Sequence, residues 1–334
     1  MEPVTHALAS ITLSRAGLNR ATRMATPMLL VSGLAGDLDW FSRFGGARVF
    51  LAAHRTATDS VAGVIAIGIV VAAIFWAVCR RTPRFQVGFF PAAAVCAAGA
   101  ASHVLLDLLN SYGVKLLWPF SSRWFALDLD ATIDPWLLII LLMGLLLPEL
   151  FRLVTQEIGA KTKAHPGMRG AIIALVVAAM YLGGRALAHE HAVVLLDSRA
   201  YREQTPLTVA AFPQSSSPLF WSGVVGTDSL IAEVEVPLSP GATFDPEAAV
   251  VHYKPDPSAA LDNARRSDAA REFLQFARIP LATVERIEGG YRVRMRDLRF
   301  GRELSERGVV AVIDLNDAGT VLDSRLEFDS ESSH

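Results

Sequence analysis

The chain has 334 residues, of which 52% are hydrophobic and 19% are charged, and its mean hydropathy is +0.36. This composition excludes an ordinary soluble enzyme and is typical of a protein with membrane spans. The charge is unevenly divided, because residues 1–188 carry 10 acidic and 16 basic side chains, whereas residues 189–334 carry 23 and 15. We therefore predict a helical membrane domain at 1–188, followed by a soluble domain at 189–334.

The membrane domain is predicted to contain one weak apolar segment and four strong spans. The weak segment, 27–41, is interrupted by glycine and aspartate residues and fits a short, broken or re-entrant helix. A bilayer-crossing helix needs about 20 apolar residues. Four segments meet this requirement, at 61–79, 88–109, 133–151 and 170–188. We therefore expect a mainly α-helical, multi-pass fold in this half.

Basic residues in two short loops predict the orientation in the membrane. They are Arg80, Arg81 and Arg84 in one loop, and Arg152, Lys161, Lys163 and Arg169 in the other. Loops rich in lysine and arginine stay in the cytoplasm. Loop 110–132 and everything after residue 188 are therefore expected on the outer, periplasmic side of a bacterial inner membrane.

The second half shows the patterns of a small α+β domain. Segments 231–236, 291–296 and 309–314 alternate or are rich in β-branched residues, and turn signals separate them. These patterns predict an antiparallel sheet. One helix is expected at 257–277, and the tail 329–334 is expected to be disordered. The two cysteines lie in apolar stretches, and the sequence has no nucleic-acid-binding motif, so we expect no nucleic-acid partner.

Ionisable side chains of the membrane half gather in a few motifs. They are His6, Asp37 with Asp39, His54 with Arg55 and Asp59, and His103 with Asp107. His103 and Asp107 are four residues apart, so a helix places them on one face. The predicted orientation brings His54, Asp59 and the His103–Asp107 pair to the same membrane surface. Because ionisable groups in a membrane are costly and usually functional, the set predicts a metal site.

The mixture of ligand types indicates which metal to expect. Imidazole and carboxylate together suit zinc first, and manganese or iron next, better than calcium. Each motif also has a plainer interpretation: a structural His6, a capped polar turn at 36–39, an internal His103–Asp107 hydrogen bond, or Asp59 as a helix cap. Their joint occurrence favours the metal. The loop 110–122 fits either interfacial aromatic residues or the lining of a substrate cleft.

Taken together, these motifs resemble the YdjM-like family of inner-membrane, metal-dependent hydrolases. The resemblance implies a helical membrane domain whose histidine and aspartate side chains bind metal. It covers roughly residues 1–150 and rests on Pro3–His6, Gly36–Asp39, His54–Arg55, Ser102–Asp107 and Asn110–Ser121.

One position departs from the family pattern. After histidine and arginine the family often continues to Thr-His-Ser, whereas this chain has Thr58, Asp59 and Ser60. An aspartate can still bind a metal, but it changes the charge of the site and with it the metal preference.

The sequence thus predicts a membrane-bound, metal-dependent hydrolase that acts at the outer face on a lipid or lipid-linked ester, with a phosphoester favoured. Arg55 is expected to stabilise a developing oxyanion, and Asp59 to take part in catalysis or bind the metal. The expected ligands are His6, Asp37, Asp39, His54, His103 and Asp107. The expected partner is membrane lipid, and no protein partner is indicated. The same residues leave two alternatives open: a non-enzymatic transporter or sensor of divalent cations, and a structural membrane protein.

Overall fold

A computed structural model describes residues 1–82, 85–157, 166–300 and 308–329, which form two compact units. The first unit comprises Met1–Asp39, Arg55–His189 and Pro213–Pro218, and the second comprises Trp40–His54, Glu190–Phe212 and Leu219–His334. The chain passes between the units several times, and one of these passages, after His189, lies within a single helix. Segment 40–54, which the sequence analysis placed in the membrane domain, belongs to the second unit.

Four helices confirm the four predicted spans. They are α4 (Val61–Cys79), α5 (Phe89–Leu108), α6 (Pro135–Glu157) and α7 (Pro166–Asp197). Each has the length and apolar composition needed to cross a membrane, and helix α7 continues to Asp197, beyond the predicted span end at 188. Of the basic residues used to predict orientation, Arg84, Lys161 and Lys163 lie outside the described residues.

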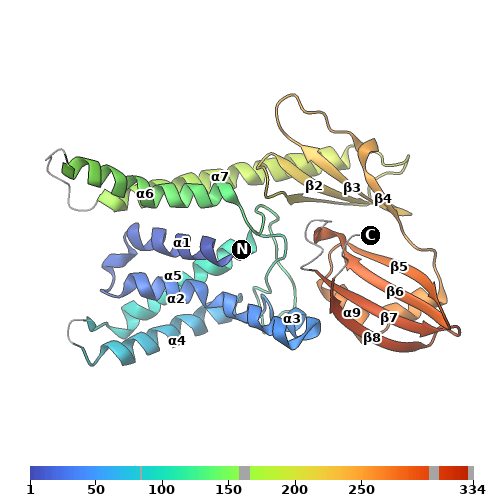
Figure 1. The fold of residues 1–334 in the computed structure, drawn as a ribbon, viewed down its shortest axis with the longest axis horizontal. Helices are drawn as coiled ribbons and strands as arrows, with labels where there is room; N and C mark the ends of the chain where they lie inside the picture. The colour runs from blue at the N-terminus through green and yellow to red at the C-terminus, as the bar shows by residue number, and fades with distance from the viewer. Residues whose placement is uncertain (83–84, 158–165, 301–307, 330–334) are drawn as a thin grey trace. The chain divides into compact units, whose positions relative to one another are not determined.

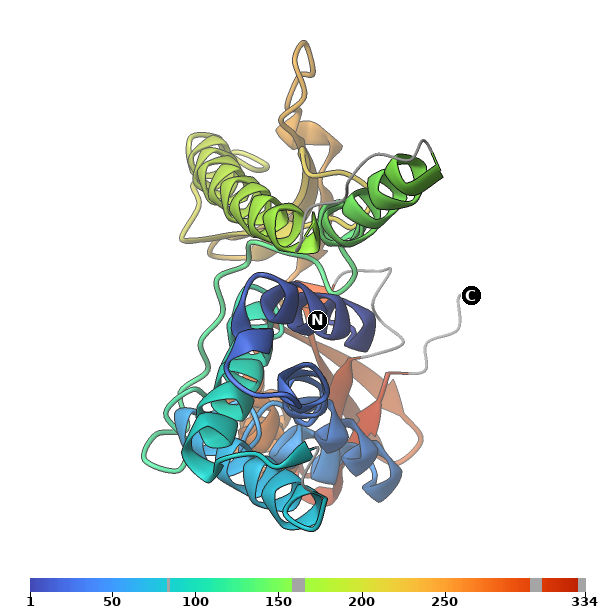
Figure 2. The same cartoon turned by 90° about the vertical axis from the view of Figure 1, so that its left-hand side faces the viewer.

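Two shorter helices, α1 and α2, pack against the spans of the first unit (Figures 1 and 2). The weak segment 27–41 forms a short α-helix and then a 3-10 helix, because glycine and aspartate residues interrupt its apolar run. α2 packs on α1 and α5, and α5 packs on α4. The bounds are α1 Pro3–Arg15, η1 Leu18–Arg20, α2 Ala25–Leu34, η2 Gly36–Gly45 and α3 Ala47–Ala53. The apolar core between α2, α4 and α5 consists of Ala25, Met28, Leu29, Val71, Ala72, Ala92, Val95 and Cys96.

Small residues allow the spanning helices to approach closely. A Cβ added to Gly144 on α6 would collide with the Cβ of Ala174 on α7. A Cβ added to Gly170 on α7 would likewise collide with the ring of Pro148 on α6. Helices in lipid are surrounded by apolar chains rather than water, so the hydrophobic effect does not drive them together. Close packing of this kind stabilises their association instead. The glycines therefore fix how α6 and α7 pack.

The second unit has the predicted α+β fold, with two antiparallel four-stranded sheets in the order β1-β2-β3-β4 and β5-β6-β7-β8. Its strands are Thr208–Pro213, Phe220–Gly226, Leu230–Pro237, Val250–Tyr253, Pro280–Ile287, Gly290–Asp297, Val309–Asn316 and Val321–Phe328. The short 3-10 helices are η4 (Pro246–Ala248) and η5 (Leu298–Phe300). Apart from Asp329, the tail expected to be disordered lies outside the described residues.

The single helix expected at 257–277 is two helices, α8 (Ala259–Arg265) and α9 (Asp268–Phe276). The break follows from Ser267, whose side-chain oxygen accepts a hydrogen bond from the N–H of Ala270 and caps the start of α9. The two helices cover one face of the second sheet (Figure 1), and Phe273 is buried there against β-strand residues. Helix α3 packs on β8, where the rings of Phe50 and Phe328 lie 5.6 Å apart.

Candidate metal centre

The orientation of His103 is fixed by helix α2. Its Nδ1 lies 2.9 Å from the carbonyl oxygen of Gly33, and because a carbonyl only accepts, Nδ1 must carry the proton. In the neutral ring, Nε2 then has a lone pair, and this atom faces Asp59 Oδ1 at 3.4 Å and Asp107 Oδ2 at 3.5 Å. A lone pair facing two carboxylates requires a positive charge between them. Either a proton or a metal ion can supply it.

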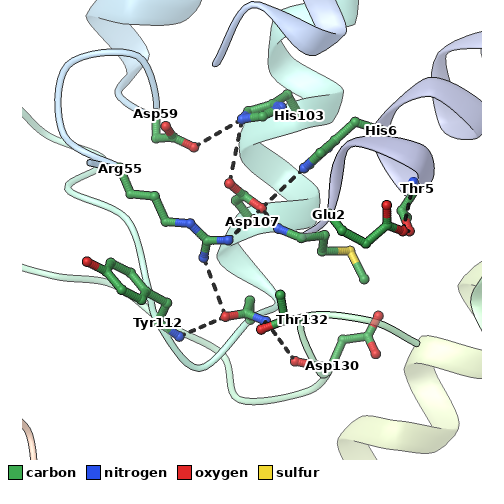
Figure 3. A network of polar contacts seen from close by, with 12 residues as sticks. Glu2, Thr5, His6, Arg55, Asp59, His103, Asp107, Tyr112, Asp130 and Thr132 are labelled. Atoms are coloured by element: carbon green, nitrogen blue, oxygen red, sulfur yellow. Dashed lines mark hydrogen bonds and ion pairs between the residues drawn. The ribbon is translucent and has the colours of Figure 1, made fainter. Parts of the chain in front are cut away.

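His6 converges on the same point from helix α1 (Figure 3). Its ring stacks on that of His103, with 4.0 Å between centroids, and its Nε2 lies 3.4 Å from Asp107 Oδ1. Ligand atoms of His6, His103 and Asp107 all lie within 4.8 Å of one another. The three residues are between 1% and 2% exposed. This group matches three of the ligands that the sequence predicted.

The charge states of the neighbouring groups suit a cation. Burial, the nearby His103 and the amino group of Met1 hold the pKa of His6 far below its ordinary value, so its ring is neutral. Burial alone would raise the pKa of Asp59, but His103 and Arg55 outweigh it and lower this pKa to about 2. Neutral imidazole and ionised carboxylate are the forms that bind metal.

Several buried polar atoms in and beside this group have no hydrogen-bond partner among the described residues. Within the described part of the chain, neither ring nitrogen of His6 forms a hydrogen bond, and neither does Asp37 Oδ2 or Asp59 Oδ1. Buried polar atoms are nearly always satisfied, so such a concentration at one place needs an explanation. A cation bound among these atoms would satisfy them together. Asp37 is close enough for His103 and Asp59 to influence its pKa, which burial raises.

Arg55 brings a buried positive charge beside the ligands. Its guanidinium donates to Asp107 Oδ1 at 3.2 Å and to Asn110 Oδ1 at 3.4 Å, and it lies 5.1 Å from the centre of the Tyr112 ring. Its backbone φ is +54°, a left-handed conformation that is uncommon outside glycine. Such conformations gather at functional sites, where the surrounding structure holds them. The Arg55 side chain is therefore well placed to contact an anionic group at this centre.

Two predicted ligands have other contacts in the structure. Asp39 Oδ2 accepts from the backbone N–H of Arg55 at 2.6 Å and from the hydroxyl of Thr58 at 3.0 Å, so Asp39 organises the turn before α4. His54 stacks on Phe50 in the second unit, with 4.5 Å between ring centroids. The roles of Asp39 and His54 as metal ligands stay predictions.

The sequence analysis missed a polar network that adjoins the centre through Asn110. The Asn110 amide donates to the backbone oxygen of Asp130 at 3.4 Å. Asp130 and Asp134 form a buried carboxyl pair, and Tyr181 on α7 donates to Asp134 at 2.5 Å. One turn further along α7, Arg185 donates to the backbone of Leu129. Arg185 could have indicated this network from the sequence, because it is the one charged residue in the predicted span 170–188 and charged residues in spans are usually functional.

The carboxyl pair leads to a prediction about pH. Burial, the hydrogen bond with Asp134 and its charge raise the pKa of Asp130 to about 9. The unfolded chain then binds fewer protons than the folded chain from about pH 4 to pH 9, so this group makes stability fall as pH rises across that window. We expect Asp130→Asn to flatten the fall in apparent Tm between pH 6 and pH 9, measured on purified protein in detergent.

Asp134→Asn is the matched comparison. Asp134 accepts from the N–H groups of Trp136 and Leu137 at the start of α6, as well as from Tyr181. Asparagine keeps an oxygen that can accept these cap hydrogen bonds, but it removes the charge that helps to raise the pKa of Asp130. Asp134→Asn should therefore also flatten the fall in apparent Tm between pH 6 and pH 9. Equal pH slopes for wild type and Asp130→Asn would contradict the raised pKa of Asp130.

Comparison with known proteins finds family models that match two parts of the chain. A family model described as YdjM inner membrane protein matches residues 1–192, which is more than half of the chain. A second, described as YfhP C-terminal alpha/beta plait domain, matches residues 259–333.

A curated relative, the uncharacterized protein YfhP of Bacillus subtilis (strain 168), is 28% identical over 115 residues. This match covers 33% of the chain and 34% of the relative. No solved structure matches the chain.

Proposed function

The chain belongs to the YdjM inner membrane protein family, and on this premise we propose that it is a membrane-embedded, metal-dependent hydrolase of lipid or lipid-linked phosphoesters. Its four apolar helices and its family support a location in the membrane. The observation that carries the proposal is the His103 ring, whose Nδ1 is held by the Gly33 carbonyl and whose Nε2 faces two carboxylates.

The residues present fit a divalent cation of the zinc type. Histidines that bind metal usually donate their other ring nitrogen to a backbone carbonyl or carboxylate, as His103 does to Gly33. His6, His103 and Asp107 would hold the ion, with Asp59 as a fourth candidate. Two imidazoles with carboxylates are a donor set suited to zinc, and also to manganese or iron.

A bound divalent cation supplies Lewis-acid chemistry, since it polarises a phosphoryl oxygen and lowers the pKa of a bound water to about 7. The protein side chains supply the remaining functions. Asp59 is ionised and can accept a proton from an attacking water. The Arg55 guanidinium can stabilise negative charge on the phosphoryl oxygens, and Asn110 and Tyr112 help to hold it in place.

Membrane location supports the choice of a lipid or lipid-linked substrate. Asp59 lies immediately before the first residue of the spanning helix α4, and Asp107 lies in the last turn of α5. Both therefore lie at span ends, where headgroups rather than acyl chains surround a helix. The predicted orientation puts these ends on the outer side, and the C-terminal domain with them. A headgroup phosphate is the anionic group available at that depth.

Metal analysis tests the proposal most directly. We expect detergent-purified wild type to contain stoichiometric zinc, manganese or iron by mass spectrometry, and the His103→Ala/Asp107→Ala variant to contain none. His252→Ala is the matched control. His252 pairs with Glu233 at 2.5 Å in the second unit, whereas the three proposed ligands belong to the first unit. This variant should keep its metal.

Loaded protein should then hydrolyse members of a panel of lipid phosphoesters, and a chelator should stop the reaction. Absence of metal from wild type, even after incubation with divalent cations, would refute the site. Metal uptake into proteoliposomes without turnover of any ester would instead favour the transporter alternative.

A further inference from the structure

The chain between α5 and α6 contains an ordered loop with an apolar tip. Its base is closed by two backbone hydrogen bonds of 2.9 Å between Val114 and Phe125. Inside the loop, the N–H of Phe120 donates to the oxygen of Leu117 at 2.9 Å. We call residues 115–124 the interfacial loop. Its backbone is held in one conformation, so the side chains at its tip have a defined direction.

The tip presents large apolar side chains that are partly or almost fully exposed in the described part of the chain. Phe120 is 94% exposed, Leu117 is 47% exposed and Trp118 is 39% exposed. Single exposed apolar residues are ordinary, but three within four positions of one rigid turn form a continuous apolar surface. Such a surface indicates a contact with something apolar outside the chain.

The hydrogen bonds of the loop indicate what that contact is. The backbone oxygen of Leu116 accepts from the N–H of Val61, the first residue of the spanning helix α4, at 3.0 Å. The loop is therefore fixed at the level where a membrane span begins. At that depth the surroundings are the interfacial layer of the bilayer, which tryptophan and other aromatic side chains prefer.

Basic side chains flank the apolar tip. Lys115 Nζ lies 4.9 Å from the centre of the Trp124 ring, and the Arg123 guanidinium lies 5.2 Å from that of Phe125. Each of the two cations therefore lies over its own aromatic ring. An apolar tip between two cations matches a leaflet with buried acyl chains and anionic phosphates.

We propose that the interfacial loop inserts Leu117, Trp118 and Phe120 into the leaflet at which α4 begins, with Lys115 and Arg123 at the lipid phosphates. The partner of this surface is the lipid bilayer. The proposal depends on the membrane location of the chain and does not depend on catalysis.

Insertion also has a consequence for the metal centre. The N–H of Lys115 donates to the backbone oxygen of Arg55 at 3.0 Å, so the loop is bonded to the segment that carries Arg55 and Asp59. An inserted loop would hold this segment at headgroup level. For the proposed hydrolase, a lipid phosphate could then reach the centre without leaving the leaflet.

Spin labelling tests the insertion in the full-length protein. Both native cysteines, Cys79 and Cys96, are buried, so a cysteine introduced by Phe120→Cys can be labelled selectively. Leu322→Cys is the matched control, because Leu322 is 68% exposed on β8 of the second unit. Both proteins are reconstituted into vesicles of phosphatidylcholine and phosphatidylglycerol. Collision rates of each label with oxygen, which concentrates in lipid, and with a water-soluble nickel chelate are then measured.

We expect the oxygen-to-nickel collision ratio at position 120 to be several-fold higher than at position 322. Equal ratios would place the loop in water and overturn the proposal. Protection of position 120 from both reagents would also overturn it, because a protein surface rather than lipid would then cover the tip. Neither measurement requires metal or turnover, so a failure here is distinguishable from a failure of the hydrolase proposal.

Discussion

Gly36→Ala should abolish metal binding although it removes no ligand. A Cβ at position 36 would overlap Nε2, Cδ2 and Cε1 of the His103 ring. The ring cannot easily move away, because it is buried, bonded to Gly33 and stacked on His6. The methyl group therefore occupies the space next to the metal-binding nitrogen. We expect metal content, measured by mass spectrometry, to fall to the level of the His103→Ala/Asp107→Ala variant.

Gly183→Ala is the control for this substitution. Gly183 lies on helix α7, and a Cβ there meets nothing within 4 Å. The same chemical change should therefore leave the metal content at the wild-type value. A circular dichroism spectrum like that of wild type for both variants would show that each protein is folded. Full metal occupancy in folded Gly36→Ala would show that the metal does not bind at His103 Nε2.

Arg55→Met should separate catalysis from metal binding. Methionine retains much of the buried side-chain volume but removes the charge beside Asp107. Because Arg55 is a cation close to a ligand carboxylate, its loss does not weaken the electrostatic attraction for a metal ion. Metal content should therefore stay at the wild-type value. Hydrolysis of a phosphoester substrate should fall by about 10²–10³-fold, as when a charge-stabilising donor is removed from other enzymes.

Arg55→Lys refines the same experiment. Lysine keeps the positive charge but lacks the planar group that contacts Asp107 and Asn110 together. Its turnover should lie between those of wild type and Arg55→Met. Unchanged hydrolysis in Arg55→Met would exclude a role for the charge in catalysis. Loss of metal from this variant would instead mean that Arg55 positions the ligands.

The sequence by itself determined the membrane spans and the class of the second domain. A run of about 20 apolar residues has one stable form in lipid, since a helix satisfies every backbone hydrogen bond internally. The spans at 61–79 and 88–109 could therefore be predicted from composition alone. Alternation of apolar and polar residues predicted strands in the same local way. The spacing of His103 and Asp107 also placed them on one helix face, because helical periodicity is local.

The tertiary structure alone decided how these local elements form a centre. The stacking of His6 on His103, the Gly33 carbonyl that fixes the His103 ring, and the space at Gly36 each require α1, α2 and α5 to pack in one arrangement. In the same way, the hydrogen bond from Tyr181 to Asp134 requires α7 to pack beside the start of α6.

Such contacts depend on the shapes of several helix surfaces at once, and no periodic pattern in the chain records them. The sequence could therefore name residue types that suit a metal, and the membrane face where they gather stays a prediction. It could not show that His103 Nε2 faces Asp59 and Asp107, because the direction of the ring is set by a backbone carbonyl on another helix.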